Sequence, residues 1–284
     1  MPDNVGDVRD VVEPYGYPDM RTTRRNAVTL TGNPLGQPMV FAHGYGCDQN
    51  MWRLVAPAFA GTHRLVLFDH VGNGRSDLSA YSDDRHSTLE GYAEDVLDIL
   101  HEHELHDVIF VGHSVSAMIG VIAANQEPER FAKLVLIGPS PRYINAPAEE
   151  YVGGFARADI EALLDSLDSN YLGWSSQMAP VIMGNAERPE LGDELTNSFC
   201  RTDPEIAKKF ARVTFLSDNR DDLLGLRTPA LILQCSDDVI APAFVGDYVH
   251  QHISGSTLVR LNATGHCPNL SAPEETVDAI KAWL

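Results

Sequence analysis

A serine lies where a predicted strand turns into a predicted helix. The strand Val108–Val111 is followed by Gly112-His113-Ser114-Val115-Ser116, and a small, apolar helical run begins at once. A serine on such a turn exposes its hydroxyl above a sheet, and the next backbone amide points to where an oxyanion forms. The usual pattern is G-x-S-x-G, and a small Ser116 is tolerable at its last position. We therefore predict that Ser114 is a nucleophile, the alternative being an ordinary loop serine.

A serine hydroxyl needs a general base, and the base needs an acid that orients it. In this architecture the chain order is serine, then acid, then histidine. Asp237 and Asp238 follow the predicted strand Ala230–Leu233, and His266 follows Thr257–Leu261. Pro242 follows Asp238 by four residues, a spacing that resembles the one in related enzymes, so we choose Asp238 over Asp237 as the acid. We therefore predict a triad of Ser114, Asp238 and His266.

A second backbone amide is needed to stabilise an oxyanion. The loop His43-Gly44-Tyr45-Gly46 follows the predicted strand Met39–Ala42, and its glycines let the backbone approach a site closely. We predict that the amides of Tyr45 and Val115 are the two donors. The alternative is a plain glycine turn without a catalytic role.

Other polar clusters point to no cofactor and no metal. His101, His103 and His106 are spaced so that they do not share one helical face, and no H-E-x-x-H motif occurs. His113 is expected to be a packing residue rather than a second base. The four cysteines form no C-x-x-C pair, so we interpret them as buried thiols.

Short β-rich runs alternate with helical patterns, which is typical of an α/β fold with a mostly parallel sheet and helices on both faces. A helix is expected over Asp48–Phe59, another after a capping box at Ser87 to Glu90, and a last one from Pro273. Residues 139–218 contain helical stripes and no convincing strand. We therefore divide the chain into a possibly flexible N-terminal arm (1–25), a core (26–138 and 219–284) and a helical cap (139–218). The predicted strands are Met39–Ala42, Leu65–Phe68, Val108–Val111, Leu134–Ile137, Ala230–Leu233 and Thr257–Leu261.

The charge balance excludes several classes of partner. The chain has 21 Lys plus Arg against 40 Asp plus Glu, a net charge of −19, so nucleic acids and anionic membranes are unfavourable partners. Its first residues are acidic and lack an apolar stretch, so we expect no signal peptide and a cytoplasmic protein. The apolar runs are too short to cross a membrane.

The motifs also carry a resemblance to a known group. The chain resembles the α/β-hydrolases that include the bacterial stress regulator RsbQ and the plant karrikin and strigolactone receptors. The resemblance implies an eight-stranded sheet and a four-helix, V-shaped cap over a hydrophobic pocket. It also implies pocket walls at Tyr45, Tyr143, Phe155, Trp174, Met178 and Phe215. The sequence segments on which the resemblance rests are His43 to Gln49, Phe68 to Gly72, Gly112 to Val115, Gly138 to Tyr143, Tyr151 to Phe155, Asn170 to Trp174 and Leu233 to Cys235.

Two functions follow from these expectations. The first is a serine esterase or lactonase that acts on a small hydrophobic ester through an acyl-enzyme intermediate. The second, implied by the resemblance, is a hydrolase-derived signalling protein that regulates a stress sigma-factor pathway through a phosphatase partner. Both hypotheses use the same pocket and the same small hydrophobic ligand.

Overall fold

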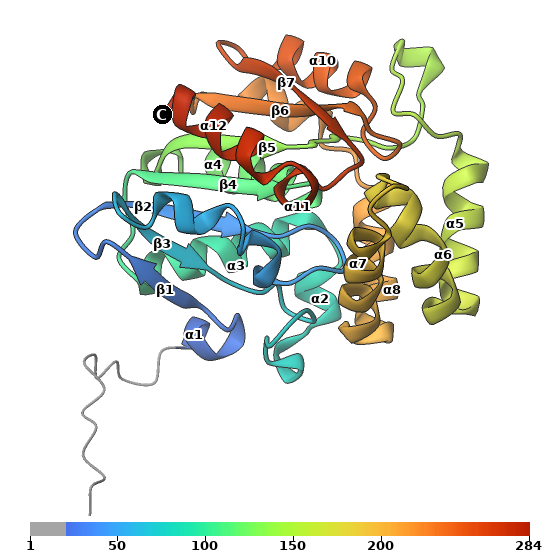
Figure 1. Ribbon diagram of the computed structural model, residues 1–284, viewed down its shortest axis with the longest axis horizontal. Helices are drawn as coiled ribbons and strands as arrows, with labels where there is room; N and C mark the ends of the chain where they lie inside the picture. Colours follow the sequence, from blue (N-terminus) through green and yellow to red (C-terminus); the bar gives the residue numbers. More distant parts are fainter. Residues whose placement is uncertain (1–20) are drawn as a thin grey trace, which may run out of the picture.

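Seven strands form one sheet in the computed structural model, which describes residues 21–284 (Figure 1). Their order is β1-β3-β2-β4-β5-β6-β7, with β1 antiparallel to β3 and all other neighbours parallel. Helices cover both faces of the sheet, so central strands such as β4 are buried along their whole length. The strands are β1 (Thr29–Gly32), β2 (Gln37–Ala42), β3 (His63–Leu67), β4 (Val108–His113), β5 (Phe131–Ile137), β6 (Ala230–Asp237) and β7 (Thr257–Thr264).

The predicted α/β class and all six predicted strands are confirmed, but the number of strands differs. Among the described residues the sheet has seven strands rather than eight. Beyond the edge strand β1, the preceding residues form the short helix α1 (Arg21–Arg25) instead of another strand. Arg25 is buried in ion pairs with Asp95 and Asp98, which hold α1 against helix α3 (Leu89–Glu102). The rest of the predicted arm, residues 1–20, lies outside the described residues.

Two layers of helices flank the sheet. Helices α3, α4, α9 and α10 pack in sequence along one face, while the 3-10 turn η1 and the helices α11 and α12 cover the other. Helix α4 is buried almost entirely, as expected for the small, apolar run after Ser114. The helices outside the cap are α2 (Asp83–His86), α3 (Leu89–Glu102), α4 (Val115–Gln126), α9 (Arg220–Gly225), α10 (Ala243–His252), α11 (Pro268–Ser271) and α12 (Pro273–Trp283).

Two predicted helix details are wrong. The segment Asp48–Phe59 forms two 3-10 turns rather than one α-helix, because Pro57 lacks the amide that a continuous helix would need. Helix α3 begins one residue later than the capping box implies, with Thr88 at its N-cap and no side-chain cap. The start of the last helix at Pro273 is confirmed. The 3-10 turns are η1 (Gln49–Trp52), η2 (Ala56–Phe59), η3 (Leu78–Ala80), η4 (Pro128–Arg130) and η5 (Pro147–Glu149).

Four helices between β5 and β6 form the cap. They lie beyond the carboxyl ends of the strands, with α6 packed on α7 and α5 packed on α8 (Figure 1). The two ends of the cap meet, because the Asn219 amide donates to the Pro141 carbonyl at 2.8 Å and Arg142 pairs with Asp218. The cap helices are α5 (Arg157–Ser169), α6 (Tyr171–Met183), α7 (Pro189–Arg201) and α8 (Pro204–Leu216).

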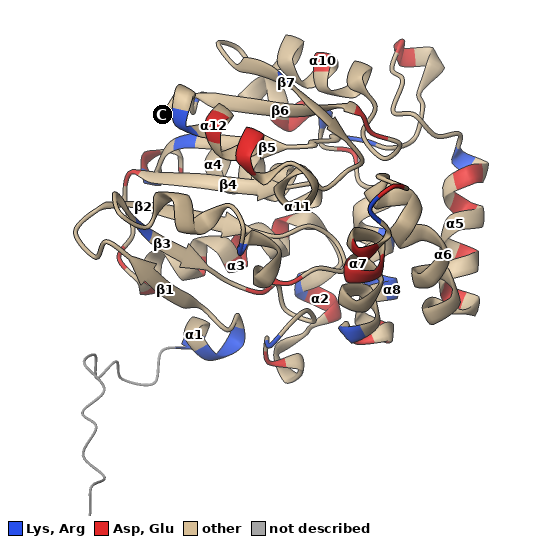
Figure 2. Cartoon of the chain, viewed as in Figure 1, with Lys and Arg blue, Asp and Glu red and all other residues tan. Residues whose placement is uncertain are grey.

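Charged side chains are distributed over the outside of the molecule. Acidic residues mark the outer helices α5, α7 and α12, while the central strands carry almost no charge (Figure 2). No helix within residues 21–284 is long and apolar enough to cross a membrane. The interior is mostly apolar, so a buried polar group without a hydrogen-bond partner is destabilising there.

Candidate active site

Ser114 occupies a sharp turn between β4 and α4. Its φ is +57° and its ψ is −123°, a conformation that a residue with a side chain adopts only under constraint. Its amide donates to the Ile137 carbonyl of the neighbouring strand β5 at 2.8 Å. A Cβ on Gly112 would lie 2.4 Å from the Ser116 carbonyl oxygen, so the turn closes tightly only with glycine there. These contacts fix the Ser114 side chain above the sheet.

A chain of hydrogen bonds joins Ser114, His266 and Asp238. Ser114 Oγ lies 2.7 Å from His266 Nε2, and His266 Nδ1 lies 2.7 Å from Asp238 Oδ2. An ionised carboxylate only accepts, so Nδ1 donates to Asp238 and Nε2 accepts the Ser114 hydroxyl proton. Residues far apart in the sequence thus form the arrangement that a serine nucleophile needs.

Asp238 directly follows β6 and is buried, whereas Asp237, the last residue of β6, is exposed. Burial opposes ionisation of Asp238, but the charge and hydrogen bond of His266, with the amides of Ala241 and Ile240, outweigh it and lower the pKa of the carboxyl. Those two amides donate to Oδ1 at 3.0 and 2.8 Å. The Asp237 carboxyl makes no hydrogen bond or ion pair with His266. Asp238 is therefore held as a carboxylate facing His266.

The end of cap helix α6 binds the loop that carries His266. The His266 amide donates to the Ile182 carbonyl at 2.9 Å, and the Asn185 side chain bridges the carbonyls of Met183 and Thr264. A Cβ on Gly265 would lie 1.8 Å from the Met183 carbonyl oxygen. The position of the imidazole thus depends on the cap as well as on the core.

The loop after β2 brings a second free amide to the site. Within residues 21–284, neither the Tyr45 amide nor the Val115 amide donates to a protein acceptor. The loop before Tyr45 is held by Ser116, whose hydroxyl donates to the His43 carbonyl at 2.5 Å and lies 2.7 Å from His70 Nε2. Sequence reasoning treated Ser116 only as a tolerable substitute for glycine. Its hydroxyl ties helix α4 to the loop that carries Tyr45.

His113 hydrogen-bonds the loop that carries His266 as well as packing beside it. Its Nε2 lies 2.7 Å from the His266 carbonyl oxygen, which only accepts, so Nε2 carries the proton. Burial and the neighbouring His266 lower the pKa of His113 to about 3. The ring stays neutral and supports the main chain of His266.

A small cavity of about 30 Å³ lies beside Ser114. Of the predicted walls, it includes Tyr45, Tyr143 and Phe215, whereas Phe155, Trp174 and Met178 do not line it. Trp174 instead packs against two of the wall residues, stacking on the Phe199 ring at 5.7 Å and meeting the Tyr45 ring edge-on at 6.3 Å. Leu195 and Phe199 lie within the predicted helical cap, but which face of their helix points to the cavity depends on how the cap helices pack. Sequence reasoning missed the walls Cys47, His113, Ile182, Leu195, Phe199, Thr214, Ile240 and Cys267.

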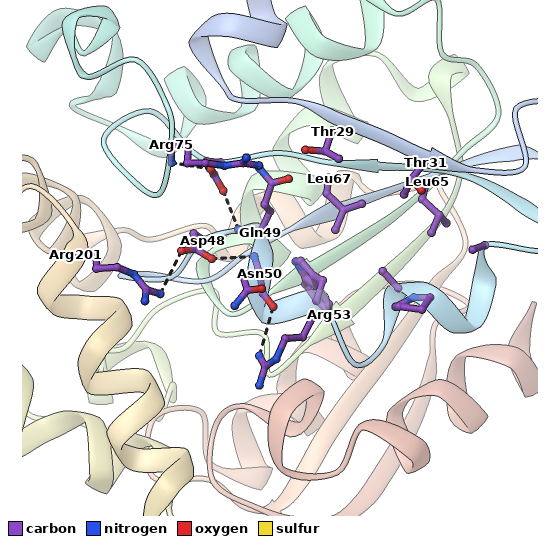
Figure 3. Close-up of a pocket in the computed structure, with 15 residues that line it drawn as sticks. Thr29, Thr31, Asp48, Gln49, Asn50, Arg53, Leu65, Leu67, Arg75 and Arg201 are labelled. Carbon is purple, nitrogen blue, oxygen red and sulfur yellow. Dashed lines mark hydrogen bonds and ion pairs between the residues drawn. The ribbon is translucent and has the colours of Figure 1, made fainter. Parts of the chain in front are cut away.

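A larger hollow of about 690 Å³ lies over β1 and β3 (Figure 3), and Ser114 does not line it. Its charged groups are largely paired with neighbours: Arg201 contacts Asp48 at 3.4 Å, and Arg53 pairs with Glu194. It contains no serine, cysteine or histidine among its lining residues. The hollow thus lacks a nucleophile with a base, and Ser114 remains the candidate site.

Comparisons with known proteins agree with this architecture. A model of the α/β-hydrolase family matches residues 39–279. The chain belongs to the α/β-hydrolase family. The Karrikin insensitive 2 receptor CA of Petunia hybrida is 38% identical over 245 residues, covering 86% of this chain and 90% of the relative. Strigolactone esterase D14 of Arabidopsis thaliana is 38% identical over 247 residues, covering 87% and 91%.

A solved structure extends the comparison. A hydrolase from Oleispira antarctica matches this α/β-hydrolase with a TM-score of 0.90 and 41% identity, over 94% of this chain and 97% of that one. The predicted resemblance to the karrikin and strigolactone group is therefore confirmed. The relatives include proteins named as receptors and proteins named as esterases.

The strain at Ser114 gives a first prediction. We expect Ser114→Gly to be more stable than Ser114→Ala by about 1 kcal/mol, because glycine adopts a positive φ without cost and alanine does not. Urea unfolding measures the difference. The exposed helical Ser176 is the matched control, since there glycine should be less stable than alanine by about 1 kcal/mol. An alanine variant at 114 that is more stable than the glycine variant contradicts the strain.

The buried histidine gives a second prediction. The pKa of His113 is lowered to about 3, so between about pH 6.5 and pH 3 the unfolded chain binds a proton that the folded hydrolase does not. Stability therefore falls with falling pH, by about 1.4 kcal/mol per pH unit for this ring. We expect His113→Gln to unfold with a shallower pH slope between pH 6 and 5 in urea titrations. An unchanged slope would show that His113 accepts a proton in the folded state.

Proposed function

We propose that this α/β-hydrolase is a serine hydrolase that cleaves a small, mostly apolar carboxylic ester or lactone. The observation that supports it most directly is the unbroken series of hydrogen bonds from Ser114 Oγ through His266 to Asp238. The apolar and aromatic wall of the cavity favours an uncharged substrate.

In the proposed reaction Ser114 Oγ attacks the ester carbonyl carbon and its proton passes to His266 Nε2. The amides of Tyr45 and Val115 stabilise the oxyanion, each contributing about 3 kcal/mol to the lowering of the barrier. His266 then gives the proton to the departing alcohol, which leaves an acyl group on Ser114. A water molecule activated by His266 hydrolyses this ester in the same way, and Asp238 holds the imidazole throughout.

Turnover of p-nitrophenyl acetate tests the assignment of the acid. We expect Asp238→Asn to lower kcat by about 10⁴-fold, because the imidazole loses the acceptor that fixes its tautomer. Asp237→Asn is the matched control and should keep wild-type activity, since its carboxyl is exposed. Equal losses in both variants would contradict the assignment.

Covalent labelling tests the nucleophile independently of the substrate. A fluorophosphonate should modify Ser114 in the wild-type protein, and peptide mass spectrometry should find the label on that residue. We expect Ser114→Ala to remain unlabelled and to lose essentially all esterase activity. A label on another residue would overturn the proposed site.

A second candidate function is supported by the relatives that are named as receptors. The cavity of about 30 Å³ has room for only about one or two water molecules, so any ligand has to displace cap side chains. Such a displacement is what a ligand-dependent signal would use. Rapid turnover of a defined metabolite would argue against a purely signalling role. The phosphatase partner, the sigma-factor pathway and the cytoplasmic location stay predictions.

A further inference from the structure

Thr214 is a buried residue of the cavity wall that the proposed reaction does not use. It lines the cavity beside Ser114, and its side chain is 1% exposed. Within residues 21–284, its Oγ1 has no hydrogen-bond partner. A buried hydroxyl without a partner is destabilising, so it calls for a physical reason.

Several other hydroxyls in helices of this protein are hydrogen-bonded within their own helix, whereas that of Thr214 is not. A serine or threonine inside a helix can donate to the carbonyl four residues earlier, which satisfies the hydroxyl. Thr214 lies in the last turn of α8, where the Phe210 carbonyl is at that position, yet it does not make this bond. The helical hydroxyls that do make it are Ser169, Ser175, Ser176, Thr196 and Thr276.

The neighbours of Thr214 locate it on the roof of the site. It shares the buried face of α8 with Ala207, whose carbonyl accepts the Tyr45 hydroxyl at 3.1 Å. The adjacent Phe215 ring lies 5.0 Å from the Tyr143 ring and 6.2 Å from the Tyr45 ring. The Tyr45 hydroxyl is already hydrogen-bonded to this cap carbonyl, so it is not free to bind a ligand. Thr214 thus lines the cavity beside Ser114, and within residues 21–284 its hydroxyl has no protein partner.

We propose that Thr214 recognises a hydrogen-bonding oxygen in the acyl part of the substrate. This inference rests on the proposed function, and it narrows the substrate to an ester or lactone with a second oxygen, such as an ether, hydroxyl or carbonyl. The acyl part is chosen because it stays attached to Ser114 inside the cavity after the alcohol leaves. The ester carbonyl itself is taken by the amides of Tyr45 and Val115.

Two esters of equal size test the proposal. p-Nitrophenyl methoxyacetate carries an ether oxygen where p-nitrophenyl butyrate carries a methylene. We expect Thr214→Val to lower the ratio of their kcat/KM values (methoxyacetate to butyrate) by roughly five- to tenfold relative to wild type, the effect of one hydrogen bond. Thr214→Ser keeps the hydroxyl and should keep the ratio within about twofold of wild type. A ratio that is unchanged in Thr214→Val overturns the proposal.

A stability measurement separates recognition from a structural role. Thr276 is a matched control, because it is fully buried in α12 and its hydroxyl donates to the Ala272 carbonyl at 2.9 Å. We expect Thr276→Val to lower the urea midpoint of unfolding, and Thr214→Val to leave it unchanged or raise it. If Thr214→Val lowers the midpoint as much as Thr276→Val does, the hydroxyl is structural and the proposal fails.

Failure of the proposed function gives a different result. In that case neither ester shows turnover that depends on Ser114, and the test moves to binding of the corresponding p-nitroanilides by calorimetry. Preferential binding of the methoxyacetyl anilide to wild type, lost in Thr214→Val, still supports recognition by Thr214. Equal binding of the two anilides to wild type overturns it.

Discussion

Ser114 keeps a backbone conformation that an L-residue adopts only when its surroundings hold it there. Three features supply that constraint: the amide hydrogen bond to β5, the absence of a side chain at Gly112, and the start of α4 at Val115. The turn cannot relax without separating the helix from the sheet. The strain is therefore sustained by the most deeply buried part of the fold, and the hydroxyl is presented at a fixed place.

The fold and the residues of the site were largely predictable from the sequence. Parallel strands end at one edge of a sheet, so residues that follow different strands, such as Ser114, Asp238 and His266, are brought together once the strands are recognised. Their hydrogen bonds are described above, while their roles in catalysis are proposals. The choice of Asp238 over Asp237 agrees with which of the two carboxyls is buried.

Other features depend on packing that the sequence does not reveal. The apolar spacing from Asp48 to Phe59 predicted one helix, but that prediction took no account of Pro57. The segment forms two short 3-10 turns instead. The walls of the cavity depend on how cap helices rotate against each other, so Phe199 replaces Trp174 there. The unpaired hydroxyl of Thr214 likewise could not be predicted from the sequence, because a helical threonine can donate to the carbonyl four residues earlier.

The neutral imidazoles around the site affect where a proton can be transferred. Burial lowers the pKa of His43, His70 and His113, so these rings stay uncharged. A cation that forms on His266 then meets no like charge from the adjacent His113 and is balanced by Asp238 alone. In the proposed reaction, the proton that leaves Ser114 would therefore pass to His266, while the surrounding rings stay neutral.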